Sequence, residues 1–505
     1  MIRFSPIPNR AHLVHWREWN DDPFDLARNQ DKPVMLFLTA FWCRFCQRMD
    51  EEAFSDHENT ALLNAYFISV RCDNAQRPDI DVRYNRNGWP TIAFMTADGD
   101  LLSVANYLPS EQFGDLLVRV YTAYHEKKDQ LRLLHQNAQQ RGADIQPCMM
   151  DPRPDLSAVA NISQQLIELA DWEYGGYGRG QKFIQPQLND FLLARYEATK
   201  DRQYLDHVCR TLDRMRESPM RDQEAGGYFR TCSGRDWSRP HREKLLGEQA
   251  GVLANCVRAF RITELPVYAR MAEELIAYLN ANLFDTTTGA FYGCEDFLRK
   301  ETNESSPAEE FFSILDGCIY TDANAQTVIA YLDAAVTLPE PRSPERALHA
   351  LEFLWKHCRS RNGAMAHYFD GTAHLTGLLD DQVYMGNALL KAYWITGDTR
   401  HLEAATALAE FILARLKNSQ GGYYDIEIPG PALAGFRLTL IGQNGRAASF
   451  FLALAEAAQN SRYREAALWA LATFSGDFNR YGLDAACFGQ ALGEYAMGAQ
   501  ARPQD

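Results

Sequence analysis

Two patterns of hydrophobic and polar residues follow each other along this chain and divide it into two parts. Within residues 1–125, short apolar runs such as 34–40 and 67–72 alternate with amphipathic segments. Continuous apolar runs of this length, bounded by Pro or Asp, are typical of buried strands. From residue 157 to residue 500, apolar residues recur at helical spacing over long segments. The pattern predicts an α/β domain (1–125), a polar linker (126–156) and an all-α barrel domain (157–500).

In the first part the predicted order is helix, strand, helix, strand, hairpin, helix. A single long helix is expected over residues 43–66. The Asp-Gly pair at 98–99 is a strong hairpin signal, so residues 91–95 and 101–104 should be antiparallel neighbours. An amphipathic helix over residues 110–124 would close the unit.

The first candidate for chemistry is the pair Cys43 and Cys46. It is the only Cys-x-x-Cys among eleven cysteines, and it follows a buried strand and opens the predicted helix. At a helix N-terminus, unpaired N–H groups and the helix dipole stabilise a thiolate and lower the pKa of the cysteine. The alternatives are half of a zinc site or two cysteines that are close by chance. Because no second Cys-x-x-Cys or spaced Cys/His pair is present, redox chemistry is favoured, and neither a metal nor another cofactor is expected.

The first part resembles the thioredoxin fold. The resemblance rests on Trp42 before the Cys-x-x-Cys, on the strands on either side of it, and on a later Pro-Thr at residues 90–91. In that fold the proline is cis and packs beside the disulfide, which implies a cis peptide bond at Pro90 and a place for it in the active site. The alternative is a trans proline at the start of an edge strand.

The chain departs from thioredoxin itself around the cysteines. Arg44 and Phe45 stand where thioredoxin has Gly-Pro, and Phe37 stands where it has a buried acid. The Arg44 charge should favour a thiolate, while the missing acid removes the usual proton acceptor for Cys46. The prediction is a specialised reductant. Cys43 would attack a disulfide of a protein or small-thiol partner, and Cys46 would resolve the mixed disulfide.

The second part contains about twelve amphipathic segments whose short and long connections alternate. The long connections carry a recurring Gly-aromatic cluster, which begins at Gly175, Gly226, Gly289, Gly363 and Gly421. Such a repeat predicts a closed ring of six helical hairpins, an (α/α)6 barrel, with an open solenoid as the alternative. All long loops would then lie on one face and lead into the inner helices.

Polar residues in these loops and at the starts of the inner helices are the candidates for a barrel site. The main ones are Arg179, Lys182, Asp236, His241, Glu248, Asp322, His367, Asp380 and Asp381. Other polar residues at the same level include Gln249, Asn324, Gln382, Gln443 and Asn444. An Asp near a helix start is more often an N-cap, which is the favoured interpretation of Asp380.

Carboxylates beside aromatic rings suit a carbohydrate ligand. A glycosidase would need two carboxylates about 5–10 Å apart, and an epimerase would need a proton-transferring His pair, for which His241 and His367 are the loop histidines. Neither set is complete in the sequence.

The net charge of −15 argues against nucleic acid or an anionic membrane as a partner. No stretch of 18 apolar residues and no signal-like N-terminus occurs, so a cytoplasmic protein is expected.

The whole chain resembles the family of spermatogenesis-associated thioredoxin-like proteins and their bacterial relatives. The matching motifs are CRFCQRMDEEAF, NGWPTIAFMTADG, GGYGRGQKF and LLDDQVYMGNALLKAYWITGD. The chain has CRFCQ where the family usually has CHWCH. The family's barrel resembles acylglucosamine 2-epimerases and glycoside hydrolases. The resemblance implies a cytoplasmic thiol–disulfide oxidoreductase whose barrel binds a substrate or partner. The alternative is a carbohydrate-active barrel with a regulatory redox domain.

Overall fold

The computed structural model describes residues 2–126, 153–299, 311–339, 344–428, 430–432 and 436–500. The chain forms two compact units, Met1–Gln146 with Ile428–Leu438, and Pro147–Glu427 with Thr439–Asp505. Most of the predicted linker, 126–156, lies outside the described residues. Residues 428–438 fall in the range predicted for the barrel but cluster with the first unit, where the Phe436 carbonyl accepts hydrogen bonds from the buried Arg83.

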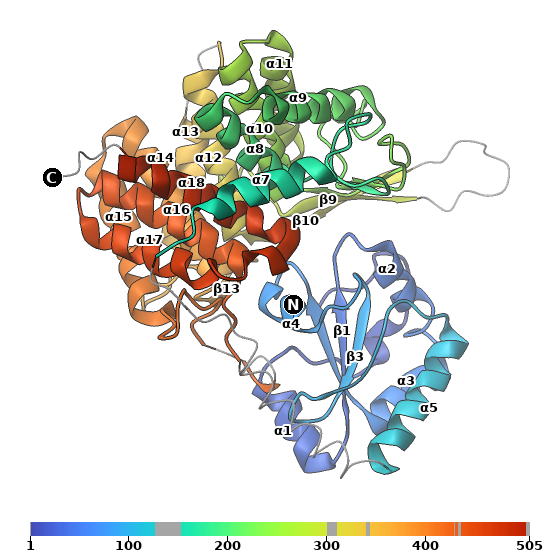
Figure 1. Ribbon diagram of the computed structural model, residues 1–505. Helices are drawn as coiled ribbons and strands as arrows, with labels where there is room; N and C mark the ends of the chain where they lie inside the picture. Colours follow the sequence, from blue (N-terminus) through green and yellow to red (C-terminus); the bar gives the residue numbers. More distant parts are fainter. Residues whose placement is uncertain are drawn as a thin grey trace. The chain divides into compact units, whose positions relative to one another are not determined.

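The first unit is built around a four-stranded sheet in the order β2-β1-β3-β4 (Figure 1). The strand β1 (Val34–Thr39) is parallel to β2 (Ile68–Asp73) and antiparallel to β3 (Thr91–Met95). The strand β4 (Leu101–Ala105) pairs antiparallel with β3, so the hairpin predicted there is confirmed.

Helices cover both faces of this sheet, which explains why β1 is apolar at every position. They are α1 (Asp21–Gln30), α2 (Arg44–Glu51), α3 (His57–Tyr66), α4 (Pro78–Tyr84) and α5 (Ser110–Glu126). Met35 and Phe37 of β1 share one hydrophobic core with residues of α2, α3 and α5. Leu36 and Leu38 face the other way, into a core with residues of α1 and α4. Successive side chains of a strand point to opposite faces, so two cores need a continuous apolar run.

The single helix predicted over residues 43–66 is wrong, because two helices occupy that stretch. Glu52 has φ −109° and ψ −81° and ends α2. Asp56 then caps α3 by accepting a hydrogen bond from the Asn59 amide at 2.9 Å. The short helix α4 was not predicted, since its seven residues are too few to show a helical period.

The second unit is an (α/α)6 barrel, as predicted. The inner helices are α8 (Pro186–Thr199), α10 (Leu246–Thr263), α12 (Thr321–Thr337), α14 (Leu379–Thr396), α16 (Ile441–Ala457) and α18 (Ala486–Gln500). Each packs on the next, and α18 packs on α8. This closure of the ring excludes the open solenoid.

The outer helices alternate with the inner ones along the chain. They are α7 (Ser157–Leu169), α9 (Arg202–Glu217), α11 (Pro266–Tyr278), α13 (Glu345–His357), α15 (Thr399–Phe411) and α17 (Ser461–Phe474). One π-helical turn continues α11 (Leu279–Leu283) and another continues α15 (Ile412–Leu416). A 3-10 segment, Phe478–Ala485, precedes α18. No helix among the described residues is long and apolar enough to cross a membrane.

The long loops that enter the inner helices form three small sheets, which were not predicted. Their strands are β5 (Lys182–Phe183), β6 (Thr231–Cys232), β7 (Pro240–His241), β8 (Lys244–Leu245), β9 (Cys294–Arg299), β10 (Phe311–Asp316), β11 (Ile319–Tyr320), β12 (Ala366–Phe369) and β13 (Ala373–Thr376). The Gly-aromatic clusters lie in the same loops. At Gly175, φ is +74° and an added Cβ would lie 2.6 Å from the Thr211 backbone, so only glycine fits there.

Candidate functional sites

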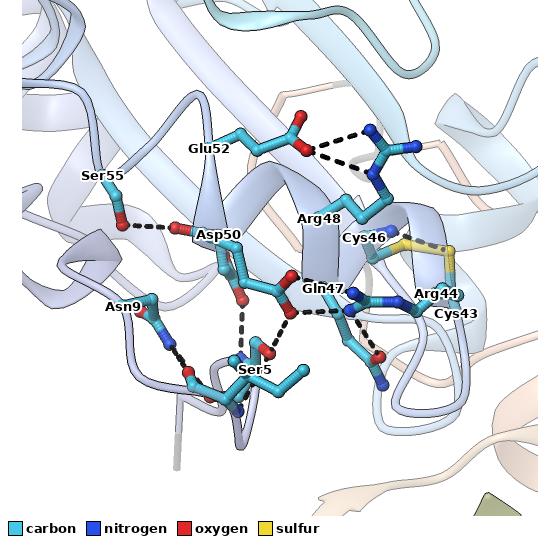
Figure 2. Close-up of polar contacts among 12 residues, drawn as sticks. Ser5, Asn9, Cys43, Arg44, Cys46, Gln47, Arg48, Asp50, Glu52 and Ser55 are labelled. Carbon is cyan, nitrogen blue, oxygen red and sulfur yellow. Dashed lines mark hydrogen bonds and ion pairs between the residues drawn. A yellow bond between two sulfur atoms is a disulfide. The ribbon is translucent and has the colours of Figure 1, made fainter. Parts of the chain in front are cut away.

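The two cysteines of the Cys-x-x-Cys motif form a disulfide at the N-terminus of α2 (Figure 2). Cys43 is the N-cap of this helix, and its Sγ accepts a hydrogen bond from the Cys46 amide at 3.1 Å. Cys43 is 6% exposed and Cys46 is 1% exposed. Since Cys43 is the more exposed residue and its Sγ faces a helical N–H group, it is the one placed to act as a nucleophile.

Two tryptophans connect the disulfide loop to the proline loop. The Trp89-Pro90 peptide bond is cis, as predicted. Trp89 lies edge-to-face on Trp42 with ring centroids 5.3 Å apart, and its Nε1 donates to Asp81 at 2.8 Å. Burial raises the pKa of Asp81. Sequence reasoning missed Asp81 because the short helix that carries it was not predicted.

The charge of Arg44 is already neutralised next to the disulfide. Its guanidinium donates to both carboxylate oxygens of Glu51, at 2.6 and 2.9 Å. The expected effect of Arg44 on the cysteine is therefore offset by an anion on the same helix. The neighbouring Phe45 is 52% exposed, and its ring lies 5.3 Å from that of Tyr107. The motif thus carries one exposed aromatic ring, which packs on the half-buried Tyr107.

A buried acid lies on α2, one turn after Cys46. Asp50 accepts two hydrogen bonds from Arg71, at 2.7 and 2.8 Å. It also accepts one from the Ser5 amide at 2.8 Å (Figure 2). The guanidinium also lies 4.9 Å from the centre of the Phe37 ring. Both oxygens of Asp50 are hydrogen-bonded, so this carboxylate positions the helix and does not replace the acid missing at position 37.

In the barrel, three of the predicted residues come together at the face of the long loops. Asp322 starts α12, His367 lies on β12 and Asp381 starts α14, and their ligand atoms all lie within 4.8 Å of one another. His367 Nδ1 is 3.0 and 3.1 Å from the two oxygens of Asp381. Burial is the main cause that raises the pKa of Asp381, to about 6. This set could transfer a proton, and its donors are also of the type that bind a metal ion, although no metal was expected.

Glu248, in the first turn of α10, is a second carboxyl with an unusual setting. Its Oε2 is buried and has no hydrogen-bond partner among the described residues. Burial raises the pKa of Glu248 to about 8. A carboxyl that stays protonated near neutral pH is a candidate proton donor.

The other predicted barrel residues do not join this cluster in one site. Three of them are exposed loop residues: Arg179, Asp236, which accepts a hydrogen bond from Ser238, and His241, which pairs with Ser233 at 3.2 Å.

Two others form ion pairs. Lys182 is fully buried and donates to Asp171 at 2.8 Å, and Arg235 also donates to this Asp171 carboxylate. Asp380 makes no N-cap hydrogen bond, contrary to the favoured interpretation, and pairs with Arg446 at 2.8 and 3.0 Å.

Four amides that were predicted to face the cavity are structural instead. They are Gln249, Asn324, Gln382 and Asn444, all fully buried. Each side chain accepts from a loop N–H and donates to the C=O of the same residue, which is Tyr228, Phe291, Met365 and Tyr423 respectively. An amide has a donor and an acceptor side by side, so it pairs with one backbone residue as a strand would. The repeated amides thus fasten the Gly-aromatic loops to the inner helices.

A cavity of about 1040 Å³ lies inside the ring and is lined by residues of all six inner helices. Sequence reasoning placed the site at the first turns of these helices. Most of the lining residues lie further along, and they include Arg258, Tyr384, Lys391, Trp394 and Glu494. Helical periodicity could have pointed to them, because Tyr384 lies one turn after Asp380 on the same helix face.

Comparisons with known proteins agree with both units. Residues 8–142 match the family model Thioredox_DsbH, described as a protein of unknown function, DUF255. Spermatogenesis-associated protein 20 from Rattus norvegicus is 29% identical over 61% of this chain and 41% of its own length. The thiol:disulfide interchange protein DsbD of Yersinia pestis is 35% identical over 22% of this chain and 18% of its own length. The predicted resemblance to spermatogenesis-associated thioredoxin-like proteins is confirmed, and the chain spans about two fifths of that rat relative.

The second unit has solved structural neighbours. The cellobiose 2-epimerase from Bacillus thermoamylovorans B4167 superposes with a TM-score of 0.52 and 14% identity, over 65% of this chain and 87% of the epimerase. At that identity the similarity establishes the barrel fold alone.

Proposed function

We propose that this chain is a thiol–disulfide oxidoreductase that uses Cys43 and Cys46, and that its barrel binds a substrate or partner. The observation that carries the proposal is the disulfide at the start of α2, with Cys43 as the N-cap. The matches to Thioredox_DsbH and DsbD support it. A cytoplasmic location is part of the proposal.

The reaction starts from the reduced pair. The Cys43 thiolate attacks one sulfur of the substrate disulfide, so that a mixed disulfide forms and the other substrate sulfur leaves as a thiolate. Cys46 loses its proton and attacks the Cys43 sulfur, which releases the second substrate thiolate. The substrate gains two electrons and the protein holds the Cys43–Cys46 disulfide. A dithiol protein or a small thiol must then reduce the protein for another cycle.

The surface next to the sulfurs suggests which disulfides are used. Phe45 offers exposed aromatic area beside the half-buried Tyr107, and the adjacent Arg44 is neutralised by Glu51. An aromatic patch of this kind favours disulfides that are flanked by apolar residues, as in a protein partner, over a small charged thiol.

Trapping with Cys46→Ser tests this proposal. The variant keeps the attacking thiol but cannot resolve the mixed disulfide, so non-reducing gels should show a covalent adduct with a disulfide-containing model protein. Cys43→Ser is the matched control and should form no adduct. An equal yield of adduct from both variants, or unchanged disulfide reduction by Cys43→Ser, would contradict the proposed mechanism.

A second candidate function is acid–base chemistry on a sugar. The Asp322, His367 and Asp381 cluster at the long loops supports it. Asp381 binds Nδ1 of His367, which makes Nε2 the ring nitrogen that would exchange a proton. Removing a proton from C2 of an open-chain sugar and returning it needs no further reactant. His241, the second histidine expected for an epimerase, does not join this cluster. The epimerase neighbour has the same fold.

Proton exchange can be measured directly. Glucose, mannose and cellobiose would be incubated with the protein in D2O, and deuterium at C2 would be followed by NMR. His367→Asn should abolish incorporation, whereas a Cys43→Ser control should not change it. Absence of deuterium in all three sugars would exclude this second function for them.

A further inference from the structure

The barrel cavity reaches the surface at the end of the inner helices that is opposite to the long loops. On α14 its lining begins at Tyr384, in the second turn, and continues to Trp394 in the last turn. Trp394 is 51% exposed. Gln459 and Asn460, in the short connection from α16 to α17, are exposed and also line the cavity. A ligand could therefore enter past Trp394 without crossing the long loops.

Four of the five cations that line the cavity are paired with carboxylates, whereas Arg464 donates to the backbone carbonyl of Tyr495 at 3.0 Å. Lys391 pairs with Asp333. Arg446 pairs with Asp380. Arg258 pairs with Asp190 and Glu197. A charged ligand would have to compete with one of these pairs and leave its former partner without a counter-ion, which is costly in a confined space.

Two carboxyl groups, Glu456 and Glu494, also line the cavity. Glu456 is exposed, and Glu494 accepts a hydrogen bond from Gln490 at 3.2 Å. Burial raises the pKa of Glu494, which favours its uncharged form. The interior is thus polar, with charges of both signs that are mostly paired, and it favours a ligand without net charge.

The uncharged polar groups of the cavity can both donate and accept hydrogen bonds. Asn387 and Gln490 line it, and the Asn387 side chain makes no hydrogen bond within the described part of the chain. Hydroxyl groups suit such amides because each can donate and accept at once. The rings of Tyr384 and Trp394 provide flat apolar faces for C–H groups. The volume of about 1040 Å³ lies slightly above the range of about 300–1,000 Å³ for small-molecule sites.

We infer that this cavity binds a neutral, polyhydroxylated molecule of oligosaccharide size, which enters at the short-connection end. Trp394 would stack on it at the entrance, and Asn387 and Gln490 would bind its hydroxyl groups further inside. This site differs from the long-loop cluster in position, and its ligand binding does not depend on the disulfide chemistry of Cys43.

Isothermal titration calorimetry with the full chain tests this inference. Cellotriose and maltotriose are the neutral probes, and glucuronic acid and glucosamine are the charged ones. We expect at least one neutral probe to bind with a dissociation constant in the millimolar range or below, and the charged probes to bind more weakly. Cys43→Ser should bind like the unmodified chain, so a failure of the redox proposal would leave this result unchanged.

Variants locate the binding. Trp394→Ala and Asn387→Leu should each lower the affinity for the neutral probe about 10-fold or more. A loss of this size follows when one contact worth about 1.4 kcal/mol of binding free energy is removed. Trp172→Ala is the matched control, because Trp172 is 42% exposed but does not line the cavity. Thermal unfolding of each variant confirms that it is folded.

Three results would overturn the inference. The first is no binding of either neutral trisaccharide at millimolar concentration. The second is binding that survives both Trp394→Ala and Asn387→Leu but is lost in Asp322→Asn, which would place the ligand at the long loops. The third is equal or tighter binding of the charged probes.

Discussion

The cysteine pair of the first unit and the long-loop cluster of the barrel are assembled in opposite ways. Cys43 and Cys46 lie in one turn of one helix, and local structure alone brings their sulfurs together. In the barrel, Asp322, His367 and Asp381 come from three elements and meet because α12 packs on α14 and β12 lies in the loop that enters α14. A local site can therefore be recognised from a short motif, whereas a site made by distant segments requires the tertiary structure. The predictions below test how far each site depends on its surroundings.

The largest effect is expected at the buried pair beneath the redox helix. Arg71→Met leaves Asp50 as a buried carboxylate without its cation, which should lower the free energy of unfolding of the first unit by about 3–5 kcal/mol. Urea denaturation followed by tryptophan fluorescence would measure it. Arg48→Met breaks the exposed pair with Glu52 and should cost about 0–1 kcal/mol. Equal effects of the two variants would contradict the role given to Asp50.

In the barrel, the amide that fastens the last Gly-aromatic loop should be the most sensitive position. Asn444→Leu removes two hydrogen bonds to Tyr423 and leaves its N–H and C=O groups buried. The expected loss of unfolding free energy is about 2–4 kcal/mol, because each unsatisfied group costs about 1–3 kcal/mol. Asn479→Leu, on the exposed pair with Gln165, is the control. A loss below that of the control would show that the loop is held in another way.

Glu248 should make the stability of the barrel depend on pH. Its folded pKa of about 8 lies above the ordinary value for Glu of about 4.3 in an unfolded chain. Between these values the folded state keeps a proton that the unfolded state has lost, so unfolding free energy falls as pH rises through this range and levels off above it. Glu248→Gln should remove the fall and stabilise the barrel by on the order of 1–3 kcal/mol at pH 9.

Thermal unfolding between pH 4 and pH 9 would reveal this difference. Glu456 lies on a different inner helix and is exposed, so Glu456→Gln is the matched control and should leave the pH dependence unchanged. Parallel pH profiles of Glu248→Gln and the unmodified chain would mean that the Glu248 carboxyl is hydrated in solution.

The smallest effect is expected at Arg44. Because Glu51 offsets its charge, Arg44→Gln should change the rate at which reduced Cys43 reacts with iodoacetamide by less than about 3-fold. Glu51→Gln should expose the Arg44 charge and speed this reaction at pH 6. A large decrease for Arg44→Gln would restore the direct role that the sequence suggested.

Much of the fold follows from local patterns. The apolar runs of β1 and β2, the Asp-Gly hairpin and the twelve barrel helices were predictable, because side-chain period and turn residues report secondary structure directly. The turn at Glu52 and the helix α4 were not, because a break inside an amphipathic stretch and a seven-residue helix leave no clear period. The small sheets were also missed, since most of their strands have only two to four residues.

The sequence by itself determined most of the helices and strands, the order of the two units and the position of Cys43 and Cys46 at a helix start, because these depend on neighbouring residues. Only the tertiary structure decided what each polar side chain does. Gln249 and Gln382 look like ligand-binding residues in the sequence but pair with loop backbones. Arg44 looks like an activating charge but faces Glu51. The partner of a polar group comes from a distant segment, and burial sets the strength of its charge, so neither can be read from local pattern.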